Sequence, residues 1–177
     1  ALPISLLRCG YAERARESAM YRDLAGFSVL PEIVERERAA ARLGYEVALF
    51  DPARHHGVAG MLRALDNPLW QEEITRCTGA GTPVLVAARD GETVGFAGPV
   101  VRQANGRGYF TGIGVTPAHE GHGLGTILFF RLCEALRKAG ADYMSLFTGT
   151  GNPAARIYRQ AGFRPVQEFA VMRRKLA

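Results

Sequence analysis

The sequence predicts a mixed α/β domain in which an antiparallel meander leads into a helix that begins at a glycine-rich turn. Two hairpin signals, Asp90-Gly91 and Asn105-Gly106, separate three runs rich in apolar and β-branched residues. Alternating glycines at 121, 123 and 125 then precede a long segment with an apolar face. At 177 residues and 47% hydrophobic content, the chain can bury a full core.

The segment before the meander is expected to form one strand and two short helices. Tyr45 to Phe50 alternates between apolar and polar residues, as a half-buried strand does. Asp51-Pro52 offers an N-cap and a first-turn proline to a helix whose apolar face runs from Val58 to Leu65. Asn67-Pro68 breaks that helix, and a second helix is expected from Leu69 to Gly79.

The strands of the meander are expected at Val84 to Ala88, Thr93 to Val101 and Tyr109 to Val115. Arg137 and Lys138 lie in the last turn of the helix after the glycines, and Gly140 ends it. The rest is predicted to be a buried strand at Tyr143 to Phe147, a helix starting at Asn152-Pro153, and a closing strand region from Arg164 to Leu176.

Residues 1–43 are predicted to be an N-terminal extension of a domain that spans residues 44–177. Ile4 to Leu7 has the pattern of a strand, Ala12 to Leu24 that of a helix, and Phe27 to Val34 that of another strand or a helix start. The alternative is a pair of charged helices, one from Glu13 and one from Glu32 to Leu43.

The glycine-rich turn is the strongest chemical signal in the chain. Glycines before a helix allow the backbone to approach a ligand, and the first N–H groups of a helix attract anions. A phosphate or pyrophosphate is therefore the expected ligand. A P-loop would need Gly-Lys-Ser or Gly-Lys-Thr, but Thr126 follows Gly125 directly. A dinucleotide oxidoreductase is disfavoured because a meander precedes the turn, and because Asp142 precedes the next apolar run instead of ending it.

Residues from about 45 to 177 resemble the GNAT superfamily of N-acetyltransferases. The signature of that family is Gln or Arg, two residues, Gly, one residue, then Gly or Ala. It maps onto Glu120-Gly121-His122-Gly123-Leu124-Gly125, where Glu120 replaces the usual Gln or Arg. A second family element matches Asn152 to Phe163: the spacing from Tyr158 to Gly162-Phe163 fits, and the spacing from Asn152 to Tyr158 is one residue short.

The resemblance implies the acyl-CoA N-acyltransferase fold, with acetyl-CoA as co-substrate and no metal. Strand Gly112 to Val115 would lend its backbone to the pantetheine arm, at a slot where it diverges from Tyr143 to Phe147. The implied coenzyme-binding residues are Ile113, Gly114, Val115, Glu120, Gly121, His122, Gly123, Leu124, Gly125, Thr126 and Asn152. An acidic group such as Glu120 beside a diphosphate is unfavourable unless it points away or is paired. Asn152 has a second interpretation as a helix cap.

Tyr158 is the candidate general acid, because a phenol can protonate the thiolate that leaves during aminolysis of a thioester. The base is not identified by the sequence. His119 and Glu120 lie near the coenzyme turn, too close to the phosphates to reach the amine. A water relay or a residue before Thr82 is an equal alternative. Trp70 would line the substrate pocket or fill the core.

The implied function is transfer of an acetyl group from acetyl-CoA to a primary amine by direct attack in a ternary complex. The alternative is a catalytically silent acyl-CoA-binding module of a tandem protein. Tyr21 to Phe27 resembles Tyr158 to Phe163 with one gap, so residues 1–43 are either the tail of a preceding GNAT-like domain or a local extension. The acceptor is expected to be a small-molecule or peptide amine.

The net charge and the composition of the chain disfavour several classes of partner. The net charge is +5, but the basic residues are scattered without interleaved aromatics, so nucleic acid is not expected. No apolar run approaches a membrane span, and the first residues lack the pattern of a signal peptide. His55 and His56 are adjacent on a predicted helix and are poor co-ligands for a metal. The three cysteines are expected to be buried free thiols of a cytoplasmic protein. A homodimer that forms through the N-terminal extension is one expected assembly.

Overall fold

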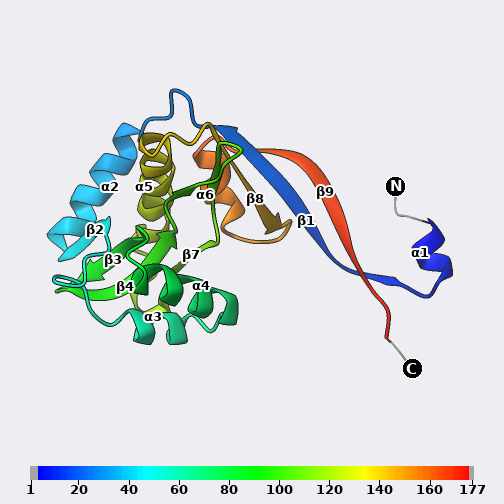
Figure 1. Ribbon diagram of the computed structural model, residues 1–177, viewed down its shortest axis with the longest axis horizontal. Coiled ribbons are helices and arrows are strands. Elements are labelled where there is room, and N and C mark those ends of the chain that lie inside the picture. The colour runs from blue at the N-terminus through cyan, green and yellow to red at the C-terminus, as the bar shows by residue number, and fades with distance from the viewer. Residues whose placement is uncertain (1–3, 176–177) are drawn as a thin grey trace. The chain divides into compact units, whose positions relative to one another are not determined.

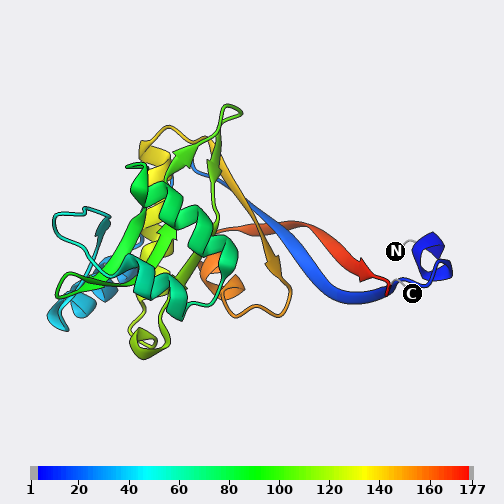
Figure 2. The same cartoon turned by 60° about the horizontal axis from the view of Figure 1, so that its bottom comes forward.

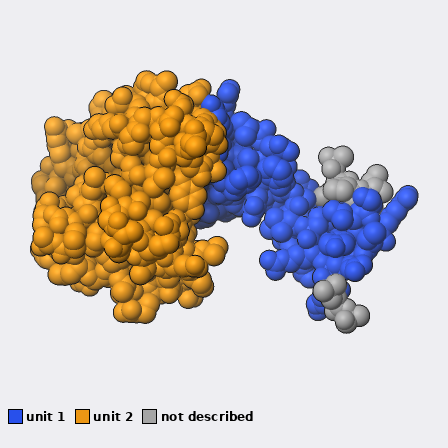
Figure 3. Space-filling view, viewed as in Figure 1, with its two compact units in different colours: residues 1–22, 145–177 blue, residues 23–144 orange. Residues whose placement is uncertain are grey.

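The computed structural model describes residues 4–175, and the chain divides into two compact units (Figure 3). The smaller unit comprises the residues up to Arg22 together with those from Ser145 onward. The larger unit comprises Asp23–Met144. Strand β8 (Tyr143–Gly149) begins in the larger unit and continues in the smaller one.

The larger unit is built on a four-stranded antiparallel sheet (Figure 1). In spatial order its strands are β2 (Tyr45–Leu49), β3 (Leu85–Arg89), β4 (Glu92–Gly98) and β7 (Gly112–Val115). β3 and β4 form the hairpin predicted at Asp90-Gly91, and Asp90 adopts the positive φ of 53° that this turn requires. β7 pairs with β4 from Gly95 opposite Val115 to Gly98 opposite Gly112, and it is the last strand of the sheet.

Helices cover both faces of this sheet (Figure 2). α3 (Val58–Ala64) and α4 (Pro68–Gly79) pack on one face, where Phe96 of β4 lies in an apolar cluster with residues of both helices. α5 (Leu124–Lys138) packs on the other face, with α2 (Pro31–Arg42) beside it. The guanidinium of Arg131 joins these two helices through hydrogen bonds to the Glu37 carboxylate. The apolar stripes of the helices are therefore what fixes the position of the residues at the edge of the sheet.

The third strand of the meander divides in two. β6 (Arg107–Tyr109) pairs with β5 (Val101–Arg102) and, in parallel, with the start of β8, where Gly108 lies opposite Met144. The chain then leaves β8 and joins β4 at Gly112 as β7. The prediction of one strand from Tyr109 to Val115 is therefore wrong in detail, and residues 110–111 connect two sheets.

The smaller unit contains two long antiparallel strands, β1 (Ala12–Asp23) and β9 (Arg164–Arg173), with β8 on the other side of β1. The short helix α6 (Ala155–Gln160) precedes β9. Arg22 donates a hydrogen bond to the carbonyl oxygen of Ala161 and fills the space beside Gly162, whose φ is 80°. This contact ties the end of β1 to the turn between α6 and β9.

The local structure predicted for the first residues is mostly wrong. The expected strand at Ile4 to Leu7 is a helix, α1 (Ile4–Arg8), and the expected helix at Ala12 to Leu24 is strand β1. Hydrogen bonding to β9 overrides the helical propensity of this charged segment. The helix expected from Glu32 is confirmed as α2. Tyr21 to Phe27 ends a strand, unlike its counterpart around Tyr158, and the assignment of residues 1–43 as an extension stays a prediction.

The predictions for two helix starts and for the burial of one cysteine are also wrong. Asp51 does not cap α3, which begins seven residues later behind Gly57; the Asp51 carboxylate instead accepts the N–H of Ala53 in a separate turn. The last helix begins at Ala155 and not at Asn152. All three cysteines are free, but Cys9 is exposed whereas Cys77 and Cys133 are buried. Among the described helices, none has the length and apolar content needed to cross a membrane.

Candidate active site

The glycine turn presents an open row of backbone N–H groups. It follows the 3-10 helix η1 (Pro117–His119) and contains Gly121 and Gly123 at φ values of 82° and 74°. No atom lies within 4 Å of where a Cβ would stand on either glycine. The N–H groups of residues 121–126 donate no hydrogen bond to any described residue. An anion can therefore reach several donors and the positive end of α5 together.

Tyr45 of β2 holds this turn in place. Its hydroxyl lies 2.9 Å from Nδ1 of His119, and its ring packs against the rings of His119 and His122 at centroid distances of 5.7 and 5.1 Å. The Arg89 guanidinium lies 5.4 Å from the Tyr45 ring centroid. Sequence reasoning missed Tyr45, because the hydrogen bond joins residues 74 positions apart and no local pattern marks it.

The other predicted loop residues divide into buried and exposed groups. Leu124 and Thr126 are buried at the start of α5, so their side chains anchor the helix and leave only their backbone N–H groups for a ligand. Glu120 and His122 are exposed, and Glu120 forms no ion pair with any described residue. The acidic substitution in the family signature is thus solvated and leaves the backbone donors open.

β7 has a free backbone edge, since β4 is its single partner in the described sheet. Ile113, Gly114 and Val115 are half-buried there. The glycines of this strand serve packing: the Trp70 indole occupies the space beside Gly112, and Leu65 Cδ1 lies 2.8 Å from a Cβ position on Gly114. The space beside these two glycines is taken by Trp70 of α4 and by Leu65, the residue that follows α3. The edge itself suits an extended ligand arm.

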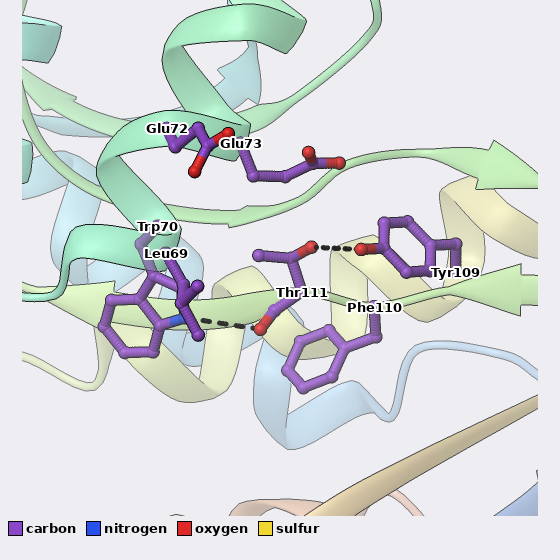
Figure 4. A pocket seen from close by; sticks show the side chains of 7 residues that line it. All are labelled: Leu69, Trp70, Glu72, Glu73, Tyr109, Phe110 and Thr111. Atoms are coloured by element: carbon purple, nitrogen blue, oxygen red, sulfur yellow. Dashed lines mark hydrogen bonds between the residues drawn. The ribbon is translucent and has the colours of Figure 1, made fainter.

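A pocket of about 390 Å³ lies beside this strand (Figure 4). It is lined by Leu69, Trp70, Glu72, Glu73, Tyr109, Phe110 and Thr111. α4 supplies the first four residues, and the segment that leads into β7 supplies the other three. Trp70 both lines the pocket and packs edge-on against Phe96 at a ring distance of 5.4 Å, so its two interpretations are compatible.

Tyr158 and Asn152 belong to the smaller unit. Tyr158 is 4% exposed, and burial raises the pKa of its phenol to about 12. The group therefore stays protonated throughout the physiological range and can act as a donor. Asn152 accepts the N–H of Ala154 through its side chain at 2.9 Å, so it shapes the turn before α6.

His55 is engaged by other groups of the chain. His55 is buried, accepts the N–H of Asp51 at Nδ1 and contacts the Glu46 carboxylate at 3.1 Å through Nε2. No group of three or more His, Cys, Asp or Glu side chains arranged for a metal ion occurs in residues 4–175.

Comparison with known proteins places this geometry in a family. A model of the acetyltransferase (GNAT) family matches residues 60–163, which is more than half of the chain. Streptothricin acetyltransferase of Streptomyces lavendulae is 36% identical over 83 residues, a match that covers 46% of this chain and 43% of that protein.

Solved structures share the fold at low identity. A GCN5-related N-acetyltransferase from Sphaerobacter thermophilus superposes with a TM-score of 0.68 at 19% identity, covering 96% of this chain and 54% of its own. A tandem GNAT protein from the clavulanic acid biosynthesis pathway gives a TM-score of 0.63 at 16% identity, covering 97% and 57%. The chain thus spans about half the length of these relatives. By the family match and the mixed α/β fold, the chain belongs to the acetyltransferase (GNAT) family.

Proposed function

We propose that this chain is an acetyl-CoA-dependent N-acetyltransferase that acetylates a primary amine by direct attack within a ternary complex. The observation that carries the proposal is the row of unengaged N–H groups at residues 121–126, held open by glycines with positive φ. Several free donors at a helix N-terminus suit a diphosphate, and the space around Gly121 and Gly123 is clear of side chains.

The coenzyme would be held by two stretches of backbone. The amides of Gly121, His122, Gly123, Leu124, Gly125 and Thr126 would bind the pyrophosphate, beside Glu120. The free edge of β7 at Ile113, Gly114 and Val115 would bind the pantetheine arm in the manner of an added strand. Acetyl-CoA supplies an activated acyl group as a thioester. No metal is required for this chemistry.

Tyr158 is proposed as the general acid, supported by its burial and its protonated phenol. Asn152 is proposed to act through the turn that it stabilises before α6. Trp70 is proposed to line the acceptor pocket together with the other residues of α4 that face it.

We further propose that residues 1–43 are the tail of a preceding GNAT-like domain, in a cytoplasmic protein that acts on a small-molecule or peptide amine. Support comes from β1, which adds a strand beside β9, and from the likeness to a tandem GNAT protein. The related streptothricin acetyltransferase makes streptothricin one acceptor to test. A homodimer would appear as a doubled mass in light scattering.

The experiment that tests the function combines calorimetry with acetyl transfer. Titration with CoA is expected to give saturable heat, and a panel of primary amines that includes streptothricin is expected to yield acetylated products. Intersecting double-reciprocal plots for the two substrates, without a burst of free CoA, support the ternary complex. Binding of CoA without transfer to any amine would identify a silent module, and absence of CoA heat would refute the coenzyme site.

A further inference from the structure

We infer that the pocket between α4 and the segment before β7 binds a positively charged group, so that the acceptors of this chain carry a second cationic centre, as diamines and polyamines do. The inference rests on the proposed function for the identity of the bound molecule as an acceptor. The charge preference of the pocket follows from its own residues.

The walls of the pocket are aromatic. Trp70, Tyr109 and Phe110 line it together with Leu69. Figure 4 shows the α4 side chains on one side of the cavity and Tyr109, Phe110 and Thr111 on the other. The faces of aromatic rings attract cations, and the attraction is strongest for indole. A volume of about 390 Å³ suits part of a small organic molecule.

Hydrogen bonds fix these walls. The Trp70 indole N–H donates to the carbonyl oxygen of Thr111 at 3.3 Å, and the Thr111 hydroxyl donates to the Tyr109 hydroxyl at 3.0 Å. The ring of Trp70 also packs edge-on against the ring of Phe96. The pocket is therefore preorganised, and a ligand does not have to order its lining.

Both charged residues that line the pocket are acidic, although the chain as a whole carries a net charge of +5. The Glu73 carboxylate is already bonded to the Arg76 guanidinium, at 2.8 and 3.2 Å. Glu72, one residue earlier on α4, forms no ion pair with any residue in the described part of the chain. Glu72 is thus the uncompensated charge, and an ammonium group is its natural complement.

We assign this cation to a nitrogen other than the one that is acetylated. An amine attacks a thioester only in its neutral form, and a carboxylate stabilises the protonated form of a bound amine. An ammonium bound by Glu72 is therefore a different nitrogen of the same acceptor. The carboxylate and the aromatic faces would orient the acceptor through this group while its other amino group reacts.

The inference is tested by binding, independently of turnover. Trp70 is the single tryptophan of the chain, so intrinsic fluorescence reports on this pocket. The two probes are N-acetyl-1,5-diaminopentane and N-hexylacetamide, which differ only in a terminal ammonium or methyl group. We expect the ammonium probe to bind roughly 2- to 10-fold more tightly, because Glu72 is exposed and an exposed ion pair adds only modestly to the attraction of the aromatic faces.

Glu72→Gln is expected to abolish this preference, whereas Glu35→Gln on the exposed face of α2 is expected to retain it. Equal binding of the two probes by the wild-type chain would overturn the inference, and so would an unchanged preference in Glu72→Gln. The comparison of probes on the wild-type chain decides the question even if the variant fails to fold.

Turnover separates the inference from the proposed function. With acetyl-CoA, kcat/KM for 1,5-diaminopentane is expected to exceed that for hexylamine. In Glu72→Gln the two kcat/KM values are expected to become equal. A charge preference in binding with no acetyl transfer to any amine would refute the proposed function and leave the cation pocket standing. Transfer at equal kcat/KM to both amines would refute the inference and leave the function standing.

Discussion

The indole of Trp70 occupies the space that a side chain on Gly112 would need. A Cβ built on Gly112 meets the indole Nε1, Cε2 and Cζ2 atoms, and one built on Gly114 meets the same ring and Leu65. The bare backbone of β7 is therefore the surface on which α4 packs. This contact connects the pocket lined by Trp70 to the strand that is proposed to hold the coenzyme arm.

Gly112→Ala is expected to destabilise the chain by about 1–3 kcal/mol, because overpacking forces either the indole or the strand to move. Urea unfolding, monitored by far-ultraviolet circular dichroism, measures the change. Gly79→Ala at the end of α4 is the control: no atom lies within 4 Å of its Cβ position, and its unfolding midpoint should stay unchanged or rise slightly. Equal destabilisation of the two variants would contradict the packing argument.

Tyr45→Phe is expected to weaken CoA binding by roughly 2- to 10-fold, which corresponds to one lost hydrogen bond. The phenyl ring would keep its contacts with His119 and His122, while the bond to Nδ1 of His119 would be lost and the turn would loosen. Calorimetry with CoA measures the affinity. Tyr11→Phe, in the smaller unit, is the matched control and should bind as the wild type does. An unchanged affinity in Tyr45→Phe would show that the turn needs no support from β2.

The sequence predicts those turns and helix starts that are set by a few neighbouring residues. The helix behind the alternating glycines, the Asp90-Gly91 hairpin and the helix break at Asn67-Pro68 each depend on a few neighbouring residues, and each prediction is confirmed. The structure adds that Asn67 caps α4, because its side chain accepts the N–H of Trp70 three residues on.

Features that depend on contacts between distant segments could not be predicted. The pocket beside β7 joins Trp70 to Thr111, 41 positions apart, through a hydrogen bond, and Trp70 also packs on Phe96. β1 has the composition of a charged helix and becomes a strand because β9 pairs with it more than 140 residues later. In both cases tertiary contacts decide a structure that local propensity leaves undetermined or opposes.

Glu120→Gln is expected to strengthen CoA binding about five-fold at low salt. Two like charges about 4 Å apart in water repel by roughly 1 kcal/mol, and Glu120 is an exposed carboxylate without an ion pair among the described residues. The gain should shrink at 0.5 M NaCl, because salt screens exposed charges. Calorimetry at both salt concentrations measures it, with Glu35→Gln as the control. A loss of affinity would mean that Glu120 contributes a direct contact to the coenzyme.

Tyr158→Phe is expected to lower kcat by roughly 100-fold or more, in the range of general acid catalysis, with CoA affinity nearly unchanged. The Tyr158 pKa of about 12 means that the wild-type rate should not fall through loss of this proton between pH 7 and 10. Steady-state kinetics and calorimetry together measure the two effects. A kcat equal to that of the wild type would remove Tyr158 from the mechanism.

The same phenol makes stability depend on alkaline pH. Burial raises the pKa of Tyr158 from 10.0 to about 12, so the folded chain holds its proton more tightly than the unfolded chain. This stabilisation is complete below pH 10 and is lost as the pH rises from 10 through 12, by about 1 kcal/mol between pH 9 and pH 11. Urea unfolding at these two pH values should show that Tyr158→Phe loses less stability than the wild type, while Tyr11→Phe behaves as the wild type. If the three chains lose equal stability, then the Tyr158 phenol ionises as readily in the folded chain as in the unfolded one, and its burial does not shift its titration.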